Sequence, residues 1–243
     1  MNKIKLFSLG ISIAMLFSTC SRDNEPNSDK TSLILPKKVT YIENIDDNNA
    51  GQDSYLTYNG NKLVSVITSS RWKSIFTYTG DLITKIEDYD TNKLFSTTTY
   101  NYTNGKLASR LIVNIETLHP YSYTTYYVHN TDGTVSYSSI NGNGKLTFKN
   151  GNLVSNIGDY AHITYEYDTK NNPFKNILGI DILVFDEDDN LGFNISKNNC
   201  IKTTEFTHTV ENIITYDSNG YATDDKECAS GSTTGCGLFK YSF

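Results

Sequence analysis

The densest group of metal-type ligands in this 243-residue chain is the run Asp186-Glu-Asp-Asp-Asn190. Asp186, Asp188 and Asn190 have the one-three-five spacing of a calcium loop, whose carboxylate and amide oxygens suit a hard divalent ion. However, Leu191 stands where such a loop needs glycine, and Lys197 stands where it needs a bidentate glutamate. The sequence therefore favours a solvated acidic turn, with a calcium site as the alternative.

Cysteines offer the second kind of chemistry. Cys228 and Cys236 bracket a Gly/Ser-rich loop between two short predicted strands, so we expect them to face each other across the final hairpin. A disulfide there would close a small ring and stabilise the fold by about 2 kcal/mol. A disulfide from Cys200 to either of them is the alternative. Zinc is disfavoured because no histidine lies at ligand spacing.

Tyrosines are abundant, at 18 residues, and they concentrate in the run Tyr121-Ser-Tyr-Thr-Thr-Tyr-Tyr127. Exposed aromatic rings stack on sugars, so this run supplies the best candidates for contact with a ligand. The candidates are Trp72, Tyr121, Tyr123, Tyr126 and Tyr127. The alternative is a ladder of cross-strand aromatic pairs that only stabilises a sheet.

Motifs for nucleophilic, nucleotide or zinc-dependent catalysis are absent from the sequence. It contains no Gly-x-Ser-x-Gly elbow, no phosphate-binding loop and no His-Glu-x-x-His motif. The four histidines, at positions 119, 129, 162 and 208, are scattered. Paired acids across a cleft, as in glycosidases, are the remaining route to an enzyme. We therefore predict a non-enzymatic protein without a cofactor.

The N-terminus has the pattern of an export signal. Lys3 and Lys5 precede an apolar run that ends near Phe17, which is too short to span a bilayer as a mature helix. The sequence Phe17-Ser-Thr-Cys20 resembles a bacterial lipobox, in which the cysteine becomes lipidated. We therefore predict a signal peptide at 1–19, and a lipidated Cys20 with a polar tether at 20–36. A plain secretion signal is the alternative.

Charge excludes one class of partner. Removal of the signal takes away two lysines and no acid, which changes the net charge from −6 to −8. Nucleic acid is therefore an unsuitable partner. The predicted address is the cell envelope, as an outer-membrane lipoprotein that faces the periplasm or the cell surface. We expect the protein to contact the membrane through its lipid anchor.

A repeated hairpin organises the rest of the chain. In the stretch from Thr99 to Leu111, two alternating tyrosines lead through Asn104-Gly105 to Leu107, Ser109 and Leu111. Looser copies place the equivalent residue at Leu63, Leu82, Val135 and Leu153. Because side chains two apart share a face, each Leu-x-Ser-x-Ile segment should present all three residues to one side. Tyr100 and Tyr102 are accordingly predicted to be structural.

These copies predict an all-β fold for a single domain at 37–243. Hairpins that add side by side form an antiparallel meander, which we expect to curve into an open or incompletely closed barrel. One helical turn is plausible between Phe174 and Val184. Phe239, Tyr241 and Phe243 alternate like the last strand of an outer-membrane barrel. Against an inserted barrel, most predicted strands have about six residues, fewer than a spanning strand needs.

The turn pattern resembles the YD repeats of Rhs-type proteins. Tyr165-Glu-Tyr-Asp168, the following Asn171-Asn-Pro-Phe-Lys-Asn176, the lipobox and the hairpins together resemble an uncharacterised family of Bacteroidetes lipoproteins with a porin-like fold. The resemblance covers 37–243 and implies a fold and an envelope location. It implies no catalytic residues.

Three hypotheses about function follow from the sequence. The first is a non-enzymatic binding or assembly module for a glycan, a peptide or a protein partner. The second is a carrier of an apolar ligand inside the curved sheet, and an outer-membrane barrel or a glycan-active enzyme is a remote third. Specific function should lie where the repeat breaks, in the Tyr121–Tyr127 run, the Pro173–Gly192 segment or the cysteine-bracketed loop.

Overall fold

The computed structural model describes residues 33–47, 51–115, 119–185 and 195–243, and Leu33–Phe243 forms one compact unit. The predicted signal peptide, Cys20 and most of the predicted tether lie outside the described residues. The same is true of the calcium candidates Asp186, Asp188 and Asn190.

Sixteen strands and one short 3-10 helix make up the described structure. In chain order they are β1 (Lys38–Ile42), β2 (Gln52–Asn59), β3 (Lys62–Thr68), β4 (Trp72–Thr79), β5 (Leu82–Asp90), β6 (Lys93–Thr103), β7 (Lys106–Asn114), β8 (Tyr121–His129), β9 (Val135–Ser139), β10 (Gly142–Lys149), β11 (Asn152–Gly158), β12 (His162–Tyr167), η1 (Ile180–Phe185), β13 (Cys200–Glu205), β14 (His208–Tyr216), β15 (Ala222–Ala229) and β16 (Gly237–Ser242).

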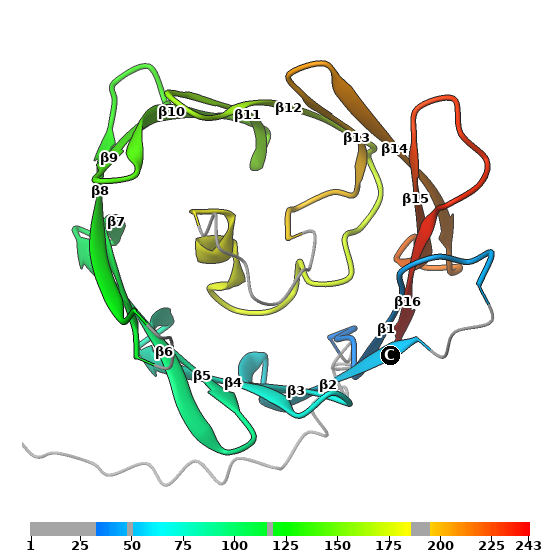
Figure 1. Ribbon diagram of the computed structural model, residues 1–243, viewed down its shortest axis with the longest axis horizontal. Coiled ribbons are helices and arrows are strands. Elements are labelled where there is room, and N and C mark those ends of the chain that lie inside the picture. Colours follow the sequence, from blue (N-terminus) through cyan, green and yellow to red (C-terminus); the bar gives the residue numbers. More distant parts are fainter. Residues whose placement is uncertain (1–32, 48–50, 116–118, 186–194) are drawn as a thin grey trace, which may run out of the picture. The chain divides into compact units, whose positions relative to one another are not determined.

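The strands form an antiparallel meander that closes into a barrel (Figure 1). The meander confirms the predicted fold class, but the prediction of an open or incompletely closed barrel is wrong. Closure comes from β1, whose Lys38–Ile42 pairs with Leu238–Ser242 of β16. A closed ring leaves no strand edge unpaired with a neighbour, and free edges are a liability that folds avoid.

A β-bulge recurs in six of the hairpins, among them β5–β6 with Phe95 as its extra residue, and explains why the sheet curves enough to close. In β2–β3, Tyr58 pairs with Leu63 while Thr57 pairs with Ser65, so Val64 is left without a partner. The equivalent bulge residues of the later hairpins are Thr84, Ala108, Val154 and Thr223. Each bulge bends its strand and increases the local twist. The prediction of an open barrel treats the hairpins as regular ladders and therefore underestimates this curvature.

The bulges also change which residues share a face. The sequence predicts Leu63, Ser65 and Ile67 on one side, whereas Leu63 and Val66 are 1% and 2% exposed and Ile67 is 42% exposed. In β5 the buried pair is Ile83 and Ile86, so the predicted position 82 is shifted by one residue. That face prediction is wrong because the extra residue reverses the alternation after each turn.

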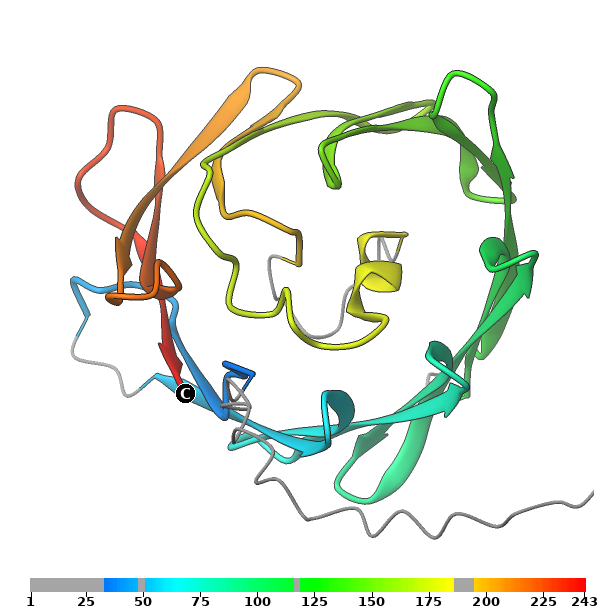
Figure 2. The same cartoon turned by 180° about the vertical axis from the view of Figure 1, so that it is seen from behind.

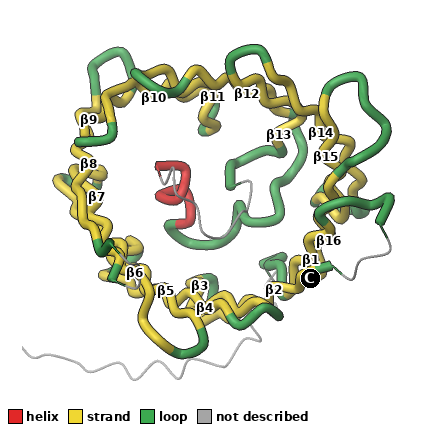
Figure 3. The backbone as a smooth tube through the Cα atoms, in the orientation of Figure 1, coloured by secondary structure: helices red, strands yellow, loops and turns green. Residues whose placement is uncertain are grey.

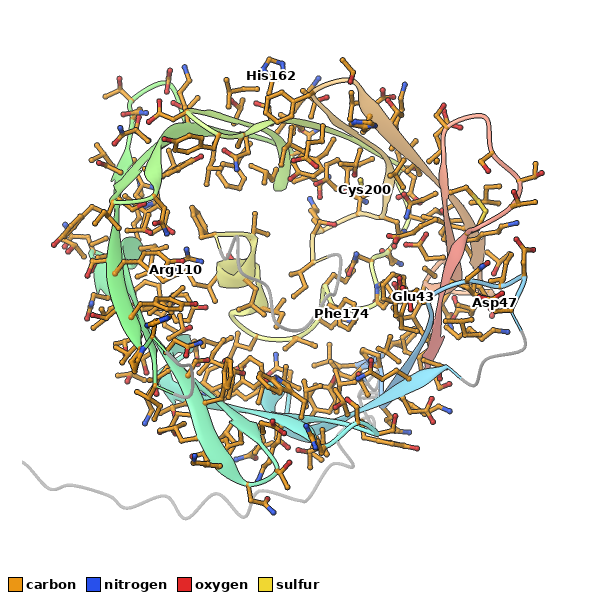
Figure 4. All side chains as sticks on the ribbon, viewed as in Figure 1. Glu43, Asp47, Arg110, His162, Phe174 and Cys200 are labelled. Atoms are coloured by element: carbon orange, nitrogen blue, oxygen red, sulfur yellow. A yellow bond between two sulfur atoms is a disulfide. The ribbon has the colours of Figure 1, made fainter. Side chains whose placement is uncertain are left out.

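We call the segment between β12 and β13 the plug, and its described residues lie inside the ring of strands (Figure 2). Its described parts are residues 168–185 and 195–199, and its single helical turn η1 falls largely where the sequence predicts one (Figure 3). Phe174, Ile177, Ile180 and Leu183 of the plug belong to the same core cluster as the inward residues of the wall. Figure 4 shows Phe174 within the ring.

We call the end of the barrel from which the plug enters the plug end. In this meander the turns that follow β2, β4, β6, β8 and β10 lie at the same end as the connection after β12. The leucines of the repeated hairpins therefore surround the plug, as do several tyrosines that precede their turns. The repeat is used to enclose a segment of the chain.

The outer face of the barrel carries charged side chains alongside exposed apolar ones such as Ile67, Val128 and Ile213. Lys85 and Glu87 alternate with the buried residues of β5 and form an ion pair of 3.1 Å. Further pairs span neighbouring strands elsewhere on the wall, namely Lys38–Asp53 at 3.5 Å, Lys202–Glu166 at 3.3 Å and Lys240–Asp224 at 3.6 Å. Such exposed pairs contribute little stability. They nevertheless show that the wall carries charge on its outer side.

Candidate binding pocket at an open seam

We call the junction between two neighbouring plug-end hairpins a seam. At four seams the ladder of paired residues stops before the plug end. The last pairs there are Lys38 with Tyr55 in β1/β2, Ser65 with Ile75 in β3/β4, Lys85 with Thr99 in β5/β6, and Ser109 with Tyr126 in β7/β8. Neighbouring hairpins therefore separate as they approach the plug.

Side chains bridge these four seams where the ladder ends. The Tyr58 hydroxyl donates to Pro36 O at 2.6 Å, the Tyr78 hydroxyl accepts from Leu63 N at 3.1 Å, the Tyr102 hydroxyl donates to Ile83 O at 2.6 Å, and His129 Nε2 lies 2.9 Å from Leu107 O. The Tyr78 hydroxyl also donates to Leu178 O of the plug at 3.0 Å. The tyrosines of the repeat thus join each hairpin to its neighbour.

Burial keeps these tyrosines protonated. It raises the pKa of Tyr78 to about 12, and it raises the pKa of Tyr58 and of Tyr102 further still. Their hydroxyl groups therefore stay neutral and available as donors across the physiological pH range. The role is structural, as predicted for Tyr102 from the repeat.

The seam between β11 and β12 is open. Pairing ends at Ser155 with Thr164, although β11 extends to Asn152 and β12 extends to Tyr167. Tyr167 has the same bulge register as Tyr102, because it pairs with Cys200 after a shift at Glu166. Within the described residues the Tyr167 hydroxyl makes no hydrogen bond, so this tyrosine does not bridge its seam as Tyr102 does. Backbone groups of both strands that face the seam are outside the ladder.

A pocket of about 640 Å³ fills the open seam, and we call it the seam pocket. Its walls come from the β10–β11 turn, the end of β12 and the two ends of the plug. The lining residues are Lys149, Asn150, Asn152, Val154, Tyr165, Glu166, Tyr167, Asp168, Thr169, Asn171, Lys175, Lys197 and Asn198. Amide, hydroxyl and ammonium groups dominate this set, and the two tyrosine rings lie 6.5 Å apart.

Hydrogen bonds fix the floor of the seam pocket. Asn152 Oδ1 accepts from the backbone N–H groups of Lys197 and Asn198, each at 3.0 Å. Asp168 accepts from Asn199 N and Asn199 Nδ2 at 3.1 Å and from the Tyr216 hydroxyl. These contacts hold the two ends of the plug together behind the gap. The site is consequently preorganised by the barrel and the plug together.

A second pocket of about 420 Å³ lies at the same end of the barrel, between η1 and the wall. Its lining is mainly apolar and includes Leu107, Val135, Phe148, Val184 and Phe185. This pocket is the residual cavity beside the plug, and we call it the apolar pocket.

A buried acidic group lies on the inner side of β14 and β15. Asn212 Nδ2 donates to Asp225 at 2.8 Å and to Glu227 at 3.2 Å, so two carboxyl groups share one amide. Burial raises the pKa of Asp225 to about 7; the charges of Glu227 and Asp168 act in the same direction, and the Asn212 hydrogen bond opposes it. Burial also raises the pKa of Glu227. In this arrangement the Asp225 carboxyl group keeps its proton up to near neutral pH.

The structure does not bring the predicted aromatic candidates to one place. Trp72 packs edge-on against Phe95 at 4.9 Å, and Tyr121 stacks with Tyr123 at 6.2 Å. Tyr126 is 62% exposed, whereas its neighbour Tyr127 is 8% exposed. The Tyr127 hydroxyl donates to Phe185 O of the plug at 3.1 Å. Tyr127 is therefore a core residue of the fold.

The cysteine prediction is confirmed. Cys228 and Cys236 form a disulfide that closes the β15–β16 loop. Cys200 is a buried thiol outside it, whose Sγ lies 3.4 Å from Lys202 O and from Thr203 Oγ1. The alternative pairing of Cys200 with either of the other two is therefore excluded.

Sequence reasoning missed the lining of the seam pocket. From the sequence, Tyr165 and Tyr167 enter only a family resemblance, and Lys149 and Asn150 carry no prediction of a site. One signal was available, because the repeat's short Gly turn is missing after Tyr167 and a 32-residue segment, 168–199, precedes the next strand. The Pro173–Gly192 segment, singled out as a break in the repeat, belongs to the plug.

Two features are absent from the described residues: a group of metal-ligating side chains and a membrane-spanning helix. No three His, Cys, Asp or Glu side chains within them are grouped so as to hold a metal ion. Residues 33–47, 51–115, 119–185 and 195–243 contain no helix of the length and apolarity needed to cross a bilayer.

Comparison with known proteins gives a fold relationship. No protein-family model matches the chain, and no curated protein matches it by sequence. A porin-like protein from Bacteroides vulgatus is 10% identical with a TM-score of 0.42, over 86% of this chain and 98% of its own. A porin-like protein from Bacteroides uniformis is 11% identical with a TM-score of 0.52, over 85% of this chain and 96% of its own. The chain therefore shares a porin-like barrel fold with the latter.

Proposed function

We propose that this protein is a non-enzymatic binding module of the cell envelope that holds a hydroxyl-rich ligand, a glycan, in the seam pocket. The observation that carries the proposal is the open β11/β12 seam, where the hairpin repeat continues but its bridge is missing. A pocket of about 640 Å³ occupies the place of the missing contacts.

The lining of the seam pocket suits a sugar. Amide and hydroxyl groups donate and accept hydrogen bonds as sugar hydroxyls do, and aromatic faces pack against the apolar side of a pyranose ring. Asn150, Thr169 and the Tyr167 hydroxyl supply the first kind of group, and the rings of Tyr165 and Tyr167 supply the second. The unpaired backbone groups of the seam add further donors and acceptors.

The proposed location rests on three observations. The Phe17–Cys20 segment resembles a lipobox, the fold is porin-like, and the wall of the barrel carries ion pairs on its outside. An inserted barrel presents an apolar band about 25 Å tall to lipid, and charges there are costly. We therefore propose a barrel that stands in water and reaches the outer membrane through a lipid on Cys20.

Replacement of the predicted lipid-bearing cysteine tests this location. Cys20→Ala should move the protein from the membrane fraction to the soluble fraction, where it should run as a dispersed species in size-exclusion chromatography without detergent. Retention in the membrane fraction would contradict the anchor. Release followed by aggregation unless detergent is present would contradict the water-facing wall.

A bulge-residue substitution tests the seam pocket. Val154 lines the pocket, and Val64 occupies the equivalent bulge of β2–β3, away from it. Val154→Trp should fill the pocket and weaken glycan binding at least about tenfold, by the loss of about 1.4 kcal/mol. Val64→Trp is the matched control and should bind as the wild type does. Isothermal titration against a panel of oligosaccharides measures both, and equal affinities would place the binding site elsewhere.

The apolar pocket supports a second candidate function, a carrier of an apolar ligand. Its lining by Leu107, Val135, Phe148 and Phe185 is what such a ligand needs. A fluorescent fatty acid should bind and be displaced by unlabelled fatty acid. Val184→Asp should abolish this binding, because a charge placed in an apolar cavity is costly. An unchanged affinity in Val184→Asp would remove this candidate.

A further inference from the structure

We propose that the ligand of the seam pocket is an anionic saccharide, whose sugar ring lies against the tyrosines and whose carboxylate or sulfate group lies between Lys149 and Lys197. This inference rests on the proposed function, because it names the chemical class that the same pocket selects.

The two lysines come from different segments, and both line the pocket. Lys149 precedes the β10–β11 turn, and Lys197 lies in the returning part of the plug. Lys197 packs against the turn itself, since a Cβ added to Gly151 would lie 3.2 Å from its Cδ. The Asn152 hydrogen bond to Lys197 N fixes this approach at 3.0 Å. Both lysine side chains are exposed toward solvent.

Neither lysine has an acidic partner among the residues that the structure describes. Within the described residues, Lys149 and Lys197 form no ion pair. The two acids that line the pocket are already engaged elsewhere: Glu166 pairs with Lys202 at 3.3 Å, and Asp168 accepts hydrogen bonds from Asn199 and Tyr216. Among the described residues the lining therefore has an excess of positive charge, since three lysines face the single unpaired carboxylate of Asp168, in a chain whose formal net charge is −6.

The third lysine of the pocket is positioned differently. Lys175 Nζ donates to Asn171 Oδ1 at 2.7 Å and lies 5.9 Å from the centre of the Tyr221 ring. These contacts hold Lys175 against the plug. It adds to the positive potential of the pocket, while Lys149 and Lys197 remain free to contact an anion. A concave site lined by one sign of charge concentrates ligands of the opposite sign.

The aromatic pair explains why the anion should be carried on a sugar. The Tyr165 and Tyr167 rings are tilted by 39° with centroids 6.5 Å apart, so together they form an angled apolar wall. A small inorganic anion would gain nothing from such a wall. A charged pyranose uses the rings and the lysines at once, and its hydroxyl groups match the amide of Asn150.

Matched ligand pairs test the inference by isothermal titration. The first pair is an oligogalacturonate and its fully methyl-esterified form, and the second is a sulfated oligogalactan and its desulfated form. In at least one pair the charged member should bind at least tenfold more tightly at low salt, and added NaCl should reduce that preference. The double variant Lys149→Gln/Lys197→Gln should bring the ratio near one without weakening the neutral member. Lys145→Gln, on an exposed side chain of β10 outside the pocket, is the control.

Each outcome decides a different claim. Equal affinity for the charged and neutral members of both pairs would overturn the anionic inference and leave the proposed function standing. Binding of none of the four saccharides would overturn the inference and count against the proposed function. A charge preference that survives in the double variant would also overturn the inference, because the anion would then be recognised elsewhere.

Discussion

The seams β5/β6 and β11/β12 are built from the same kind of hairpin and end differently. In both, the ladder stops before the plug end, and in both a tyrosine stands at the last inward position of the strand that follows. Tyr102 donates to Ile83 O and so closes its seam. Tyr167 makes no such contact among the described residues, and a pocket lies beside it.

The difference shows how a repeat built for stability can leave room for binding. On the bridged side of the barrel, apolar residues of the wall pack directly on the plug, and tyrosine hydroxyls join the hairpins. At the open seam, the connecting role passes to polar side chains behind the gap, namely Asp168, Asn199 and Asn152. The gap itself is then available to a ligand.

The largest predicted difference between the open-seam side and the bridged side of the barrel is in how the free energy of unfolding depends on pH. Asp225 lies near Asp168, on the inner wall that follows the open seam, and its pKa is raised to about 7 from about 3.8. Between these values the folded protein holds a proton that the unfolded chain releases, so rising pH favours unfolding. The free energy of unfolding should therefore fall between about pH 4 and pH 7, by at most about 4 kcal/mol from this group. Asp225→Asn should remove that fall, as measured by urea denaturation across this range.

The outer wall supplies the control for the pH prediction. The hydrogen bond from Thr40 lowers the pKa of Asp53, and Tyr55 and Lys38 contribute in the same direction. Stability from Asp53 is present above its ordinary pKa and is lost as pH falls, which is the opposite sign. Asp53→Asn should therefore keep the fall between pH 4 and pH 7. If Asp225→Asn keeps it as well, the buried carboxyl is not its source.

The next largest difference is expected when equivalent core residues on the bridged side and on the open-seam side are replaced by alanine. Ile83 and Leu153 occupy the same position after their turns, with exposures of 0% and 8%. Ile83→Ala should destabilise the fold by about 3 kcal/mol, because it leaves a cavity between the wall and the plug. Leu153→Ala should cost about 2 kcal/mol, since its site adjoins the open seam and is able to relax. Urea denaturation measures both, and equal losses would mean that the open seam is packed as tightly as the bridged one.

Local sequence signals predicted much of the fold. Asn-Gly turns marked hairpins such as β6–β7, where Asn104 and Gly105 both adopt positive φ, at 53° and 73°. Closure was not predictable in this way, because it depends on pairing between β1 and β16, which are almost 200 residues apart in the chain. The bulges were also missed, since Val64 and Val154 look like ordinary members of alternating strands.

The seam pocket was harder to predict than the fold. Its walls come from β10–β11, from β12 and from both ends of the plug, so no single stretch of sequence contains it. Tyr167 has the same residue type as the bridging Tyr102, and only the missing hydrogen bond distinguishes them. A break in the repeat indicated the plug, but the position of the plug inside the barrel is a tertiary feature.

The smallest effect bears most directly on the comparison, because it removes one oxygen atom from each seam. Tyr102→Phe deletes the donor to Ile83 O and leaves that buried carbonyl without this partner, so it should cost about 1 kcal/mol of unfolding free energy. Tyr167→Phe deletes a hydroxyl that makes no hydrogen bond within the described residues, so its cost should stay below about 0.5 kcal/mol. Urea denaturation at one pH compares the two variants, and glycan titration should show the reverse order, with Tyr167→Phe the weaker binder. If Tyr167→Phe is as destabilising as Tyr102→Phe, the β11/β12 seam is bridged in solution, and the pocket loses its physical basis.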